Sequence, residues 1–280
     1  MVLMSFLRIL PLWIPSSPCS GSMAYISYLD LPKHWGLKRG DVVLLTSDIM
    51  QLMFTALRNG ERFDRDAFLD AVLEVIGQEG TLLIPTFNWD FCHGVAFDYH
   101  KTPCKTGALG GFALGRADFR RTQHPLYSFA VAGKDQQILC DMQNISSFGA
   151  DSPFGYLERS HAKNVIIGIH YTDCFTFVHH CEEICGVSTY RFQKSFTGQY
   201  VDAEGRVTTR SYSMLVRSYE LYLETDLTLI GEKMEEAGVA KLIYLNEVPY
   251  RIVDLAAAAP VICDDILHNA SRGICKHKGQ

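Results

Sequence analysis

Short apolar runs alternate with helical patterns along the first two thirds of the chain. The segments DVVLLT (41–46), TLLIPTF (81–87) and NVIIGI (164–169) are compact apolar runs of the kind that forms buried strands. Between the first two, residues 47–60 and 64–80 carry apolar side chains at helical spacing, and both segments close on glycine. A strand, helix and strand order of this kind predicts an α/β fold with a central sheet.

The remaining pattern predicts further helices, loops and strands. Asp64 stands at the N-cap position of the second helix. Later helices are predicted at 108–117, 135–144, 228–238 and 256–270, and strands at the end of 119–133 and within 241–255. Two stretches without periodicity are predicted as loops, at 88–107 and 146–155. The first of these is long and rich in polar and aromatic residues, which is typical of a functional loop.

The pattern changes after Tyr190. Residues 193–218 alternate polar and apolar positions around the turn sequence DAEG (202–205), which predicts an antiparallel hairpin. We therefore predict a single domain over 23–280 with a small subdomain or lid around 190–225. Residues 1–22 are apolar and then rich in Ser and Pro, without a basic start, and are predicted to be a disordered leader or extension.

Composition places the chain among ordinary soluble proteins. Of its 280 residues, 48% are hydrophobic and 20% are charged, and the net charge is -5, which argues against binding to nucleic acid. No later segment approaches the roughly 20 apolar residues of a membrane helix. Nine cysteines without a paired CxxC spacing favour a reducing cytoplasm over a disulfide framework. Homo-oligomerisation is possible, but the sequence leaves the subunit number open.

The stretch CFTFVHHCEE (174–183) carries the densest candidate chemistry. In a helix, His179 and Glu182 lie three residues apart on one face, whereas His180 is turned about 100° away. A carboxylate beside an imidazole holds the ring in one tautomer and stabilises its protonated form, as general-base catalysis requires. The same spacing also occurs in exposed helix pairs without function.

Two other interpretations of this stretch are open. Zinc could be held by His179 and Glu182 with Cys181 or His93, although no second spaced ligand pair accompanies them. A nucleophilic role for Cys181 is less favoured, because a cysteine within a buried helix usually acts as a small apolar residue. We predict no metal.

Several segments together resemble the aminoglycoside 3-N-acetyltransferase family, also called the antibiotic N-acetyltransferases. They are, in the family's order, GDVVLLTSDI, EGTLLIPTFNWDF, FDYHKTPCKTGALG, FRRTQHPLYSFAVAGK, FGADSPFGYL and TFVHHCEE followed by YRFQKSFTG. The resemblance covers about 37–198 and continues more loosely to the end. It implies a three-layer α/β fold with a central sheet, and acetyl-CoA as co-substrate for transfer to a small-molecule amine.

The resemblance also implies roles for individual residues. The family's catalytic H-x-x-E motif falls on His179 and Glu182, with Thr176 or a nearby backbone N–H as a candidate oxyanion donor. Transfer is then direct, within a ternary complex. Coenzyme A contacts are implied at the end of the first strand and around the R-S-x-H-P-x-x-S motif, which here gives Thr46, Ser47, Arg121, Thr122 and Ser128.

The acceptor is the least defined part of this resemblance. Resistance enzymes of the family usually have H-S-S-L where this chain has TSDI, so the acceptor need not be an aminoglycoside. Trp89, Asp90 and His93 in the long loop could bind a sugar by stacking and hydrogen bonding, although Trp89 could equally be a core residue beneath the loop. A cytoplasmic amino-sugar is therefore a further candidate acceptor. Two alternatives from other classes are an inactive coenzyme A-binding protein of the same fold and a metal-dependent hydrolase.

Overall fold

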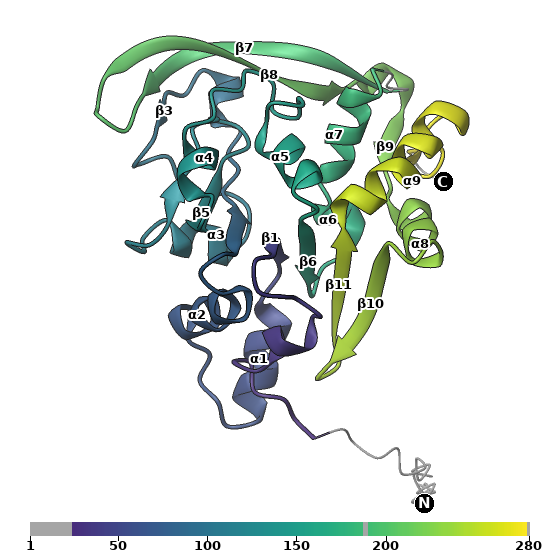
Figure 1. Cartoon of the computed structure of the whole chain (residues 1–280). Coiled ribbons are helices and arrows are strands. Elements are labelled where there is room, and N and C mark those ends of the chain that lie inside the picture. Colours follow the sequence, from purple (N-terminus) through teal and green to yellow (C-terminus); the bar gives the residue numbers. More distant parts are fainter. Residues whose placement is uncertain (1–23, 187–189, 279–280) are drawn as a thin grey trace, which may run out of the picture.

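The computed structural model describes residues 24–186 and 190–278, so the predicted leader at 1–22 lies outside the described residues. The fold is a central mixed sheet with helices on both faces (Figure 1). The sheet strands, in spatial order, are β10 (Ala240–Leu245), β11 (Val248–Asp254), β6 (Lys163–Ile167), β1 (Val42–Ser47), β2 (Thr81–Pro85), β5 (Phe129–Gly133) and β4 (Arg120–Arg121). This confirms the predicted three-layer α/β architecture.

The three central strands, β6, β1 and β2, run parallel, whereas the outer strands pair antiparallel. Leu44 of β1 pairs with Leu83 of β2 on one side and with Asn164 of β6 on the other. The chain therefore leaves β1 toward β2 and later returns to the opposite neighbour, β6. The carboxyl ends of all three strands meet at one edge, where α/β folds usually place their ligands.

Side chains of β1 alternate between the two faces of the sheet, and each face is covered. Val42 and Leu44 pack into one apolar cluster, while Val43 and Leu45 pack into the other. The first cluster is formed with helices α4 (Gln136–Cys140), α5 (Pro153–Arg159), α7 (Phe177–Ile184), α8 (Thr228–Glu236) and α9 (Leu255–His268). The second is formed with α1 (Met50–Arg58), α2 (Arg65–Ile76) and α3 (Ala108–Ala113). Burial on both faces explains why this strand is continuously apolar.

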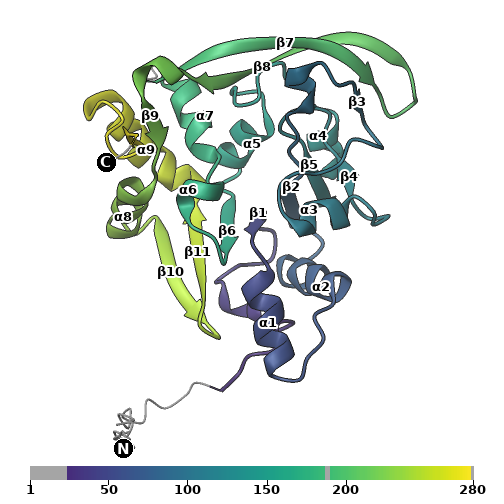
Figure 2. The ribbon, with the colours of Figure 1, turned by 180° about the vertical axis from the view of Figure 1, so that it is seen from behind.

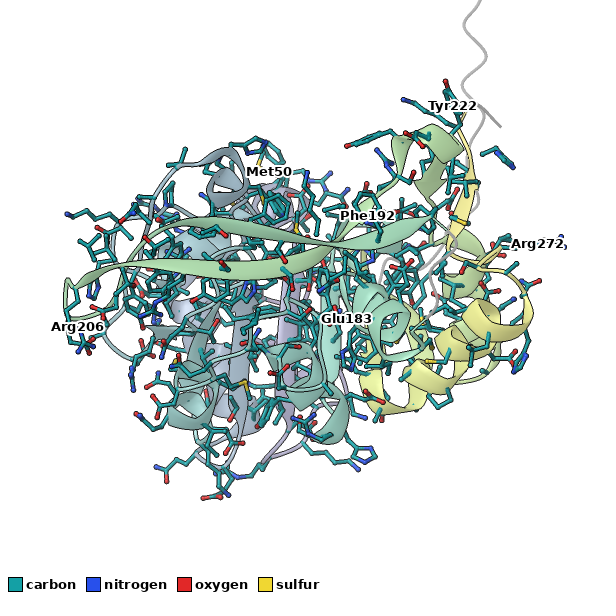
Figure 3. All side chains as sticks on the ribbon, turned by 90° about the horizontal axis from the view of Figure 1, so that it is seen from above. Met50, Glu183, Phe192, Arg206, Tyr222 and Arg272 are labelled. Carbon is teal, nitrogen blue, oxygen red and sulfur yellow. The ribbon has the colours of Figure 1, made fainter. Side chains whose placement is uncertain are left out.

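The predicted hairpin is present as β7 (Arg191–Val201) and β8 (Val207–Arg217), which pair antiparallel along their whole length. It arches over one end of the domain (Figures 1 and 2). Seen from above, Arg206 lies at its tip and Phe192 near its other end (Figure 3). Phe91, Phe97 and Leu126 pack against Tyr200 and Tyr212 beneath the hairpin.

Short elements complete the fold: η1 (Leu31–His34), η2 (Asp90–His93), β3 (Phe97–Asp98), α6 (Tyr171–Cys174), η3 (Tyr219–Leu221), β9 (Leu223–Thr225) and β12 (Cys275–His277). The prediction of a loop over 146–155 is wrong for its last residues, because α5 begins at Pro153. Ser152 accepts a hydrogen bond from the Gly155 N–H, and Pro153 occupies the first helical turn. A Ser-Pro pair that reads as a loop signal thus also starts a helix. Within the described residues, no helix has the length and hydropathy of a membrane span.

Adjacent glycines in α3 test how tightly this helix packs on β2. A Cβ at Gly110 would lie 2.1 Å from the Pro85 carbonyl oxygen, whereas one at Gly111 would make an ordinary 3.6 Å contact with Cys104. We expect Gly110→Ala to lower the unfolding free energy by about 1–3 kcal/mol through overpacking. Gly111→Ala is the matched control and should be neutral or stabilise by up to about 1 kcal/mol. Urea unfolding measures both, and equal effects would contradict the close approach.

Candidate active site

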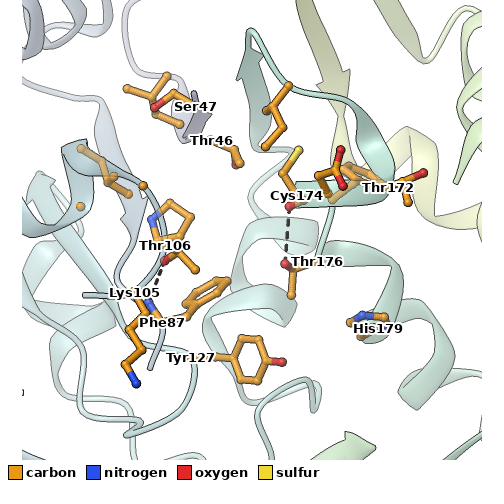
Figure 4. A pocket seen from close by; sticks show the side chains of 18 of the residues that line it. Thr46, Ser47, Phe87, Lys105, Thr106, Tyr127, Thr172, Cys174, Thr176 and His179 are labelled. Atoms are coloured by element: carbon orange, nitrogen blue, oxygen red, sulfur yellow. Dashed lines mark hydrogen bonds between the residues drawn. The ribbon is translucent and has the colours of Figure 1, made fainter. Parts of the chain in front are cut away.

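A cavity of 440 Å³ opens at the carboxyl ends of the three parallel strands. Thr46 and Ser47 at the end of β1 line it, and Phe87 follows the end of β2. The opposite side is formed by α6 and the start of α7 (Figure 4), which follow β6 in the chain. The cavity size suits a small-molecule ligand.

His179 lines this cavity, and Glu182 lies behind it on the same face of α7. The His179 Nδ1 and the Glu182 Oε2 are 2.6 Å apart, and the Glu182 side chain is completely buried. The ring donates its Nδ1–H to the carboxylate, so Nε2 is the nitrogen left for the cavity. The predicted helix and the predicted pair are therefore both present in the structure.

Arg191, at the start of β7, completes the environment of this pair. Its Nε lies 3.3 Å from the Glu182 Oε2, and its guanidinium donates to the Thr225 hydroxyl at 2.7 Å. Burial and the Arg191 charge lower the pKa of His179, while the hydrogen bond that the ring donates to Glu182 and the negative charge of Glu182 oppose them. His179 is therefore neutral at physiological pH and able to accept a proton. Arg191 lies in the quoted segment YRFQKSFTG but was not predicted as a residue of the site.

The neighbouring His180 has a different environment. It is buried, with its Nδ1 2.6 Å from the Phe148 carbonyl and its Nε2 2.8 Å from the Glu158 carboxylate. Both ring nitrogens are engaged with protein groups away from the cavity. Adjacent histidines thus have separate roles, because successive helical residues face different directions.

Cys174 and Thr176 also line the cavity. The Thr176 hydroxyl donates to the Cys174 carbonyl at 3.4 Å, a long bond (Figure 4). Burial raises the pKa of the Cys174 thiol to about 12, so it stays protonated. Cys181 is fully buried in the core between α7 and α9, and its raised pKa likewise opposes a nucleophilic role.

The residues expected to bind coenzyme A divide into two groups. Thr46 and Ser47 lie at the cavity, whereas Arg121, Thr122 and Ser128 do not line it and are buried. The Arg121 guanidinium donates to the carbonyls of Thr102 at 2.6 Å and Thr86 at 3.2 Å, and to the Ser128 hydroxyl at 3.0 Å. Burial lowers the pKa of Arg121 to about 10.

These bonds give the buried group a structural role. The Thr122 hydroxyl accepts the Phe129 N–H at 2.9 Å, and the Ser128 hydroxyl donates to the Thr86 carbonyl at 3.0 Å. The three side chains hold the end of β2, the long loop and β5 together. Direct contact with a phosphate is not supported by this geometry, because their polar atoms are already engaged inside the protein. Arg121 is not a solvated surface charge either, because its side chain is buried.

Of the residues expected to bind the acceptor, Trp89 lines the cavity and the other two do not. Asp90 accepts a hydrogen bond from Lys105 at 2.5 Å, and His93 is exposed with its Nδ1 3.1 Å from the Trp89 carbonyl. The aromatic residues Phe87 and Tyr127 also line the cavity, beside Trp89, and were not predicted as site residues. Both lie in the quoted segments, but the sequence does not indicate the direction of their side chains.

A metal centre finds no support in the described part of the chain. Within residues 24–186 and 190–278, no group of three or more His, Cys, Asp or Glu side chains is arranged to hold a metal ion. His93, one proposed ligand, lies outside the cavity that His179 lines. The site is therefore an apolar and hydroxyl-rich cavity with one imidazole and carboxylate pair.

Solved structures share this fold. The aminoglycoside acetyltransferase AAC(3)-Xa superposes with a TM-score of 0.71 at 20% identity, covering 85% of this chain and 90% of that chain. The YokD protein from Bacillus subtilis gives 0.70 at 19% identity, covering 89% and 96%. AAC-IIIb in a binary complex with CoASH gives 0.68 at 17% identity, covering 87% and 97%. A search of curated proteins found no matching sequence.

The fold and the cavity define an α/β protein with a small-molecule site at the carboxyl ends of its parallel strands. Residues 49–263 match the sequence model of the aminoglycoside 3-N-acetyltransferase family, and the chain belongs to this family. It is accordingly an acyltransferase. The resemblance inferred from the motifs is confirmed.

The environment of His179 predicts its titration. We expect the pKa of His179 to lie below that of an exposed histidine, to rise in Arg191→Gln and to fall further in Glu182→Gln. Removing the arginine removes a nearby positive charge, and removing the carboxylate removes the group that stabilises the imidazolium. NMR titration of the ring Cε1–H with labelled histidine measures these shifts. Equal pKa values in all three proteins would contradict the assigned charge environment.

Proposed function

We propose that the protein is an acetyl-CoA-dependent N-acetyltransferase that acetylates an amine of an aminoglycoside or a related amino-sugar, with His179 as the general base. The observation that carries this proposal is the 2.6 Å bond between His179 and Glu182 at the wall of the cavity. Family membership supports acetyl transfer. The binary complex of AAC-IIIb with CoASH, a protein of the same fold, supports acetyl-CoA as the donor.

The acceptor must lose a proton before it can attack. An ammonium has no lone pair for the thioester carbon, so the neutral imidazole first takes one proton from it and passes this proton to solvent. The free amine then attacks, the imidazole takes the second proton as the C–N bond forms, and this proton goes to the sulfur as the C–S bond breaks and coenzyme A leaves as the thiol. His179 is kept neutral by burial and by Arg191. Glu182 then offsets the charge of the imidazolium and keeps Nε2 directed to the acceptor.

Attack on the thioester places negative charge on its carbonyl oxygen. Thr176 lines the cavity at the N-terminus of α7, and its hydroxyl makes a single 3.4 Å bond to Cys174. This hydroxyl can turn to donate to the oxyanion, and the positive end of the helix dipole favours the same charge. Thr46 and Ser47 on the facing strand end are proposed contacts of the coenzyme arm.

Transfer is direct, without an acyl-enzyme. The thiol lining the cavity, Cys174, is protonated and donates to the His170 carbonyl at 3.2 Å. A thiol held in this way is a poor nucleophile. Holding donor and acceptor together in one cavity supplies the rate advantage through positioning instead.

The first test is removal of the base. We expect His179→Ala to lower kcat/KM by about 100-fold or more, the scale of general-base catalysis. Release of coenzyme A thiol from acetyl-CoA is measured with a panel of aminoglycosides and amino-sugar nucleotides. His268→Ala, at an exposed histidine at the end of α9, is the matched control and should retain full activity.

Two results would contradict this assignment. Unchanged turnover in His179→Ala would remove the general base from the mechanism. Coenzyme A binding by the wild-type chain without thiol release for any amine would favour an inactive coenzyme A-binding protein.

The second test concerns direct transfer. We expect mass spectrometry of the intact protein, after incubation with acetyl-CoA alone, to show no acetylated species, because the cavity thiol is protonated. Initial rates with both substrates varied should give intersecting lines. A stoichiometric acetyl adduct on Cys174 together with parallel lines would establish a double-displacement mechanism instead.

A further inference from the structure

The charge of the cavity wall limits which amines it can hold. Among the described residues that line the cavity, Asp173 is the one carboxylate and Lys105 the one lysine. Asp173 is exposed at the end of α6, and no ion pair to it is found among the described residues. Apart from His179, the other lining side chains are uncharged. Lys105 is paired with Asp90, so the wall offers a ligand one negative charge, that of Asp173.

Two other carboxylates near the cavity, Glu182 and Asp90, are already compensated. Glu182 is fully buried behind His179 and is shared by His179 and Arg191. Asp90 is held by Lys105 at 2.5 Å, and this contact lowers the pKa of Asp90. Neither group is available for additional ammonium groups of a ligand.

The remaining wall is suited to hydroxyls and to an apolar face. Figure 4 shows Phe87, Lys105 and Thr106 along one side of the pocket and Thr172, Thr176 and His179 along the other. The rings of Phe87 and Trp89 lie 4.8 Å and 6.0 Å from that of Tyr127. Aromatic rings bind C–H-rich faces, and threonine hydroxyls bind substrate hydroxyls.

A ligand with several ammonium groups would lose water without gaining counter-charges in this cavity. Burial of an uncompensated charge is costly, and hydroxyl groups do not replace a carboxylate. A ligand with a single ammonium has one counter-charge in this wall, that of Asp173. Its remaining surface then contacts the aromatic side chains.

We infer that the acceptor is a small amine with one ammonium group and a C–H-rich or apolar face, such as a mono-amino sugar, rather than a polycation. This inference rests on the proposed acetyl transfer and narrows its substrate class. Asp173 is the specificity-determining residue that attracts the ammonium.

Binding and turnover of matched amines test the inference. Glucosamine and benzylamine serve as monoamines, and kanamycin and gentamicin serve as polyamines. With the full-length protein and acetyl-CoA, we expect kcat/KM for the better monoamine to exceed that of either polyamine by at least about tenfold. This ratio corresponds to one favourable charge interaction that is missing for the polyamine. Raising the salt from about 50 to about 500 mM should change the monoamine KM by less than about threefold, as expected for one screened charge pair.

Charge variants test whether the charge of the cavity wall causes the preference for monoamines. Asp173→Asn should lower kcat/KM for the monoamine by about threefold, mainly through KM, because the attraction of one exposed carboxylate to one ammonium is lost. Asp264→Asn, at an exposed position of α9, is the matched control and should have no effect. Lys105→Glu should improve kcat/KM for the polyamines relative to the monoamines. A polyamine used better than every monoamine by the wild-type protein, with a strongly salt-dependent KM, would overturn the inference.

A binding measurement separates this inference from the proposed function. Calorimetry with the full-length protein saturated with coenzyme A, which has no acetyl group to transfer, measures acceptor affinity without turnover. Tighter binding of a monoamine than of kanamycin and gentamicin supports the inference even if no thiol is released with acetyl-CoA. Tighter binding of a polyamine refutes it even if acetyl transfer is confirmed.

Discussion

The bond between His179 and Glu182 is the interaction on which the site depends. A carboxylate with no exposed surface is stable only with charged or hydrogen-bonding partners, and it has them in His179 and Arg191. These partners come from two elements, α7 and β7. The Glu182 carboxylate therefore orients the imidazole, and through Arg191 it also ties the hairpin to the helix that carries the base.

The position of this pair follows from the sheet. Parallel strands β6, β1 and β2 end at one edge, and the last residues of β1 and β2 together with the chain after β2 and β6 form the cavity wall. The strand ends supply hydroxyl and aromatic groups, and the segment after β6 turns through α6 into α7 and supplies the reactive group. The arrangement of the strands forms the cavity, whereas one face of α7 supplies the residues that react.

Much of the motif that the family resemblance assigns to coenzyme A binding has a structural role instead. Arg121 and Ser128 bond to the carbonyl of Thr86, at the end of β2, where the chain enters the cavity wall. A buried arginine with carbonyl and hydroxyl partners fixes loop geometry rather than meeting solvent. These residues act on the site by holding Phe87 and its neighbours in place, which explains how a motif can belong to a site without touching a ligand.

Sequence pattern alone determined the apolar strands, the helical face shared by His179 and Glu182, and the hairpin after Tyr190, because each depends on local periodicity. It did not decide that Arg121 is buried, that His93 lies outside the cavity, or that Arg191 of β7 contacts Glu182 of α7. Those outcomes depend on which elements pack together and on the direction of each side chain. The spacing of residues along the chain contains no such information. Only the tertiary structure therefore decided which polar side chains bond to other groups of the protein and which remain accessible to a substrate.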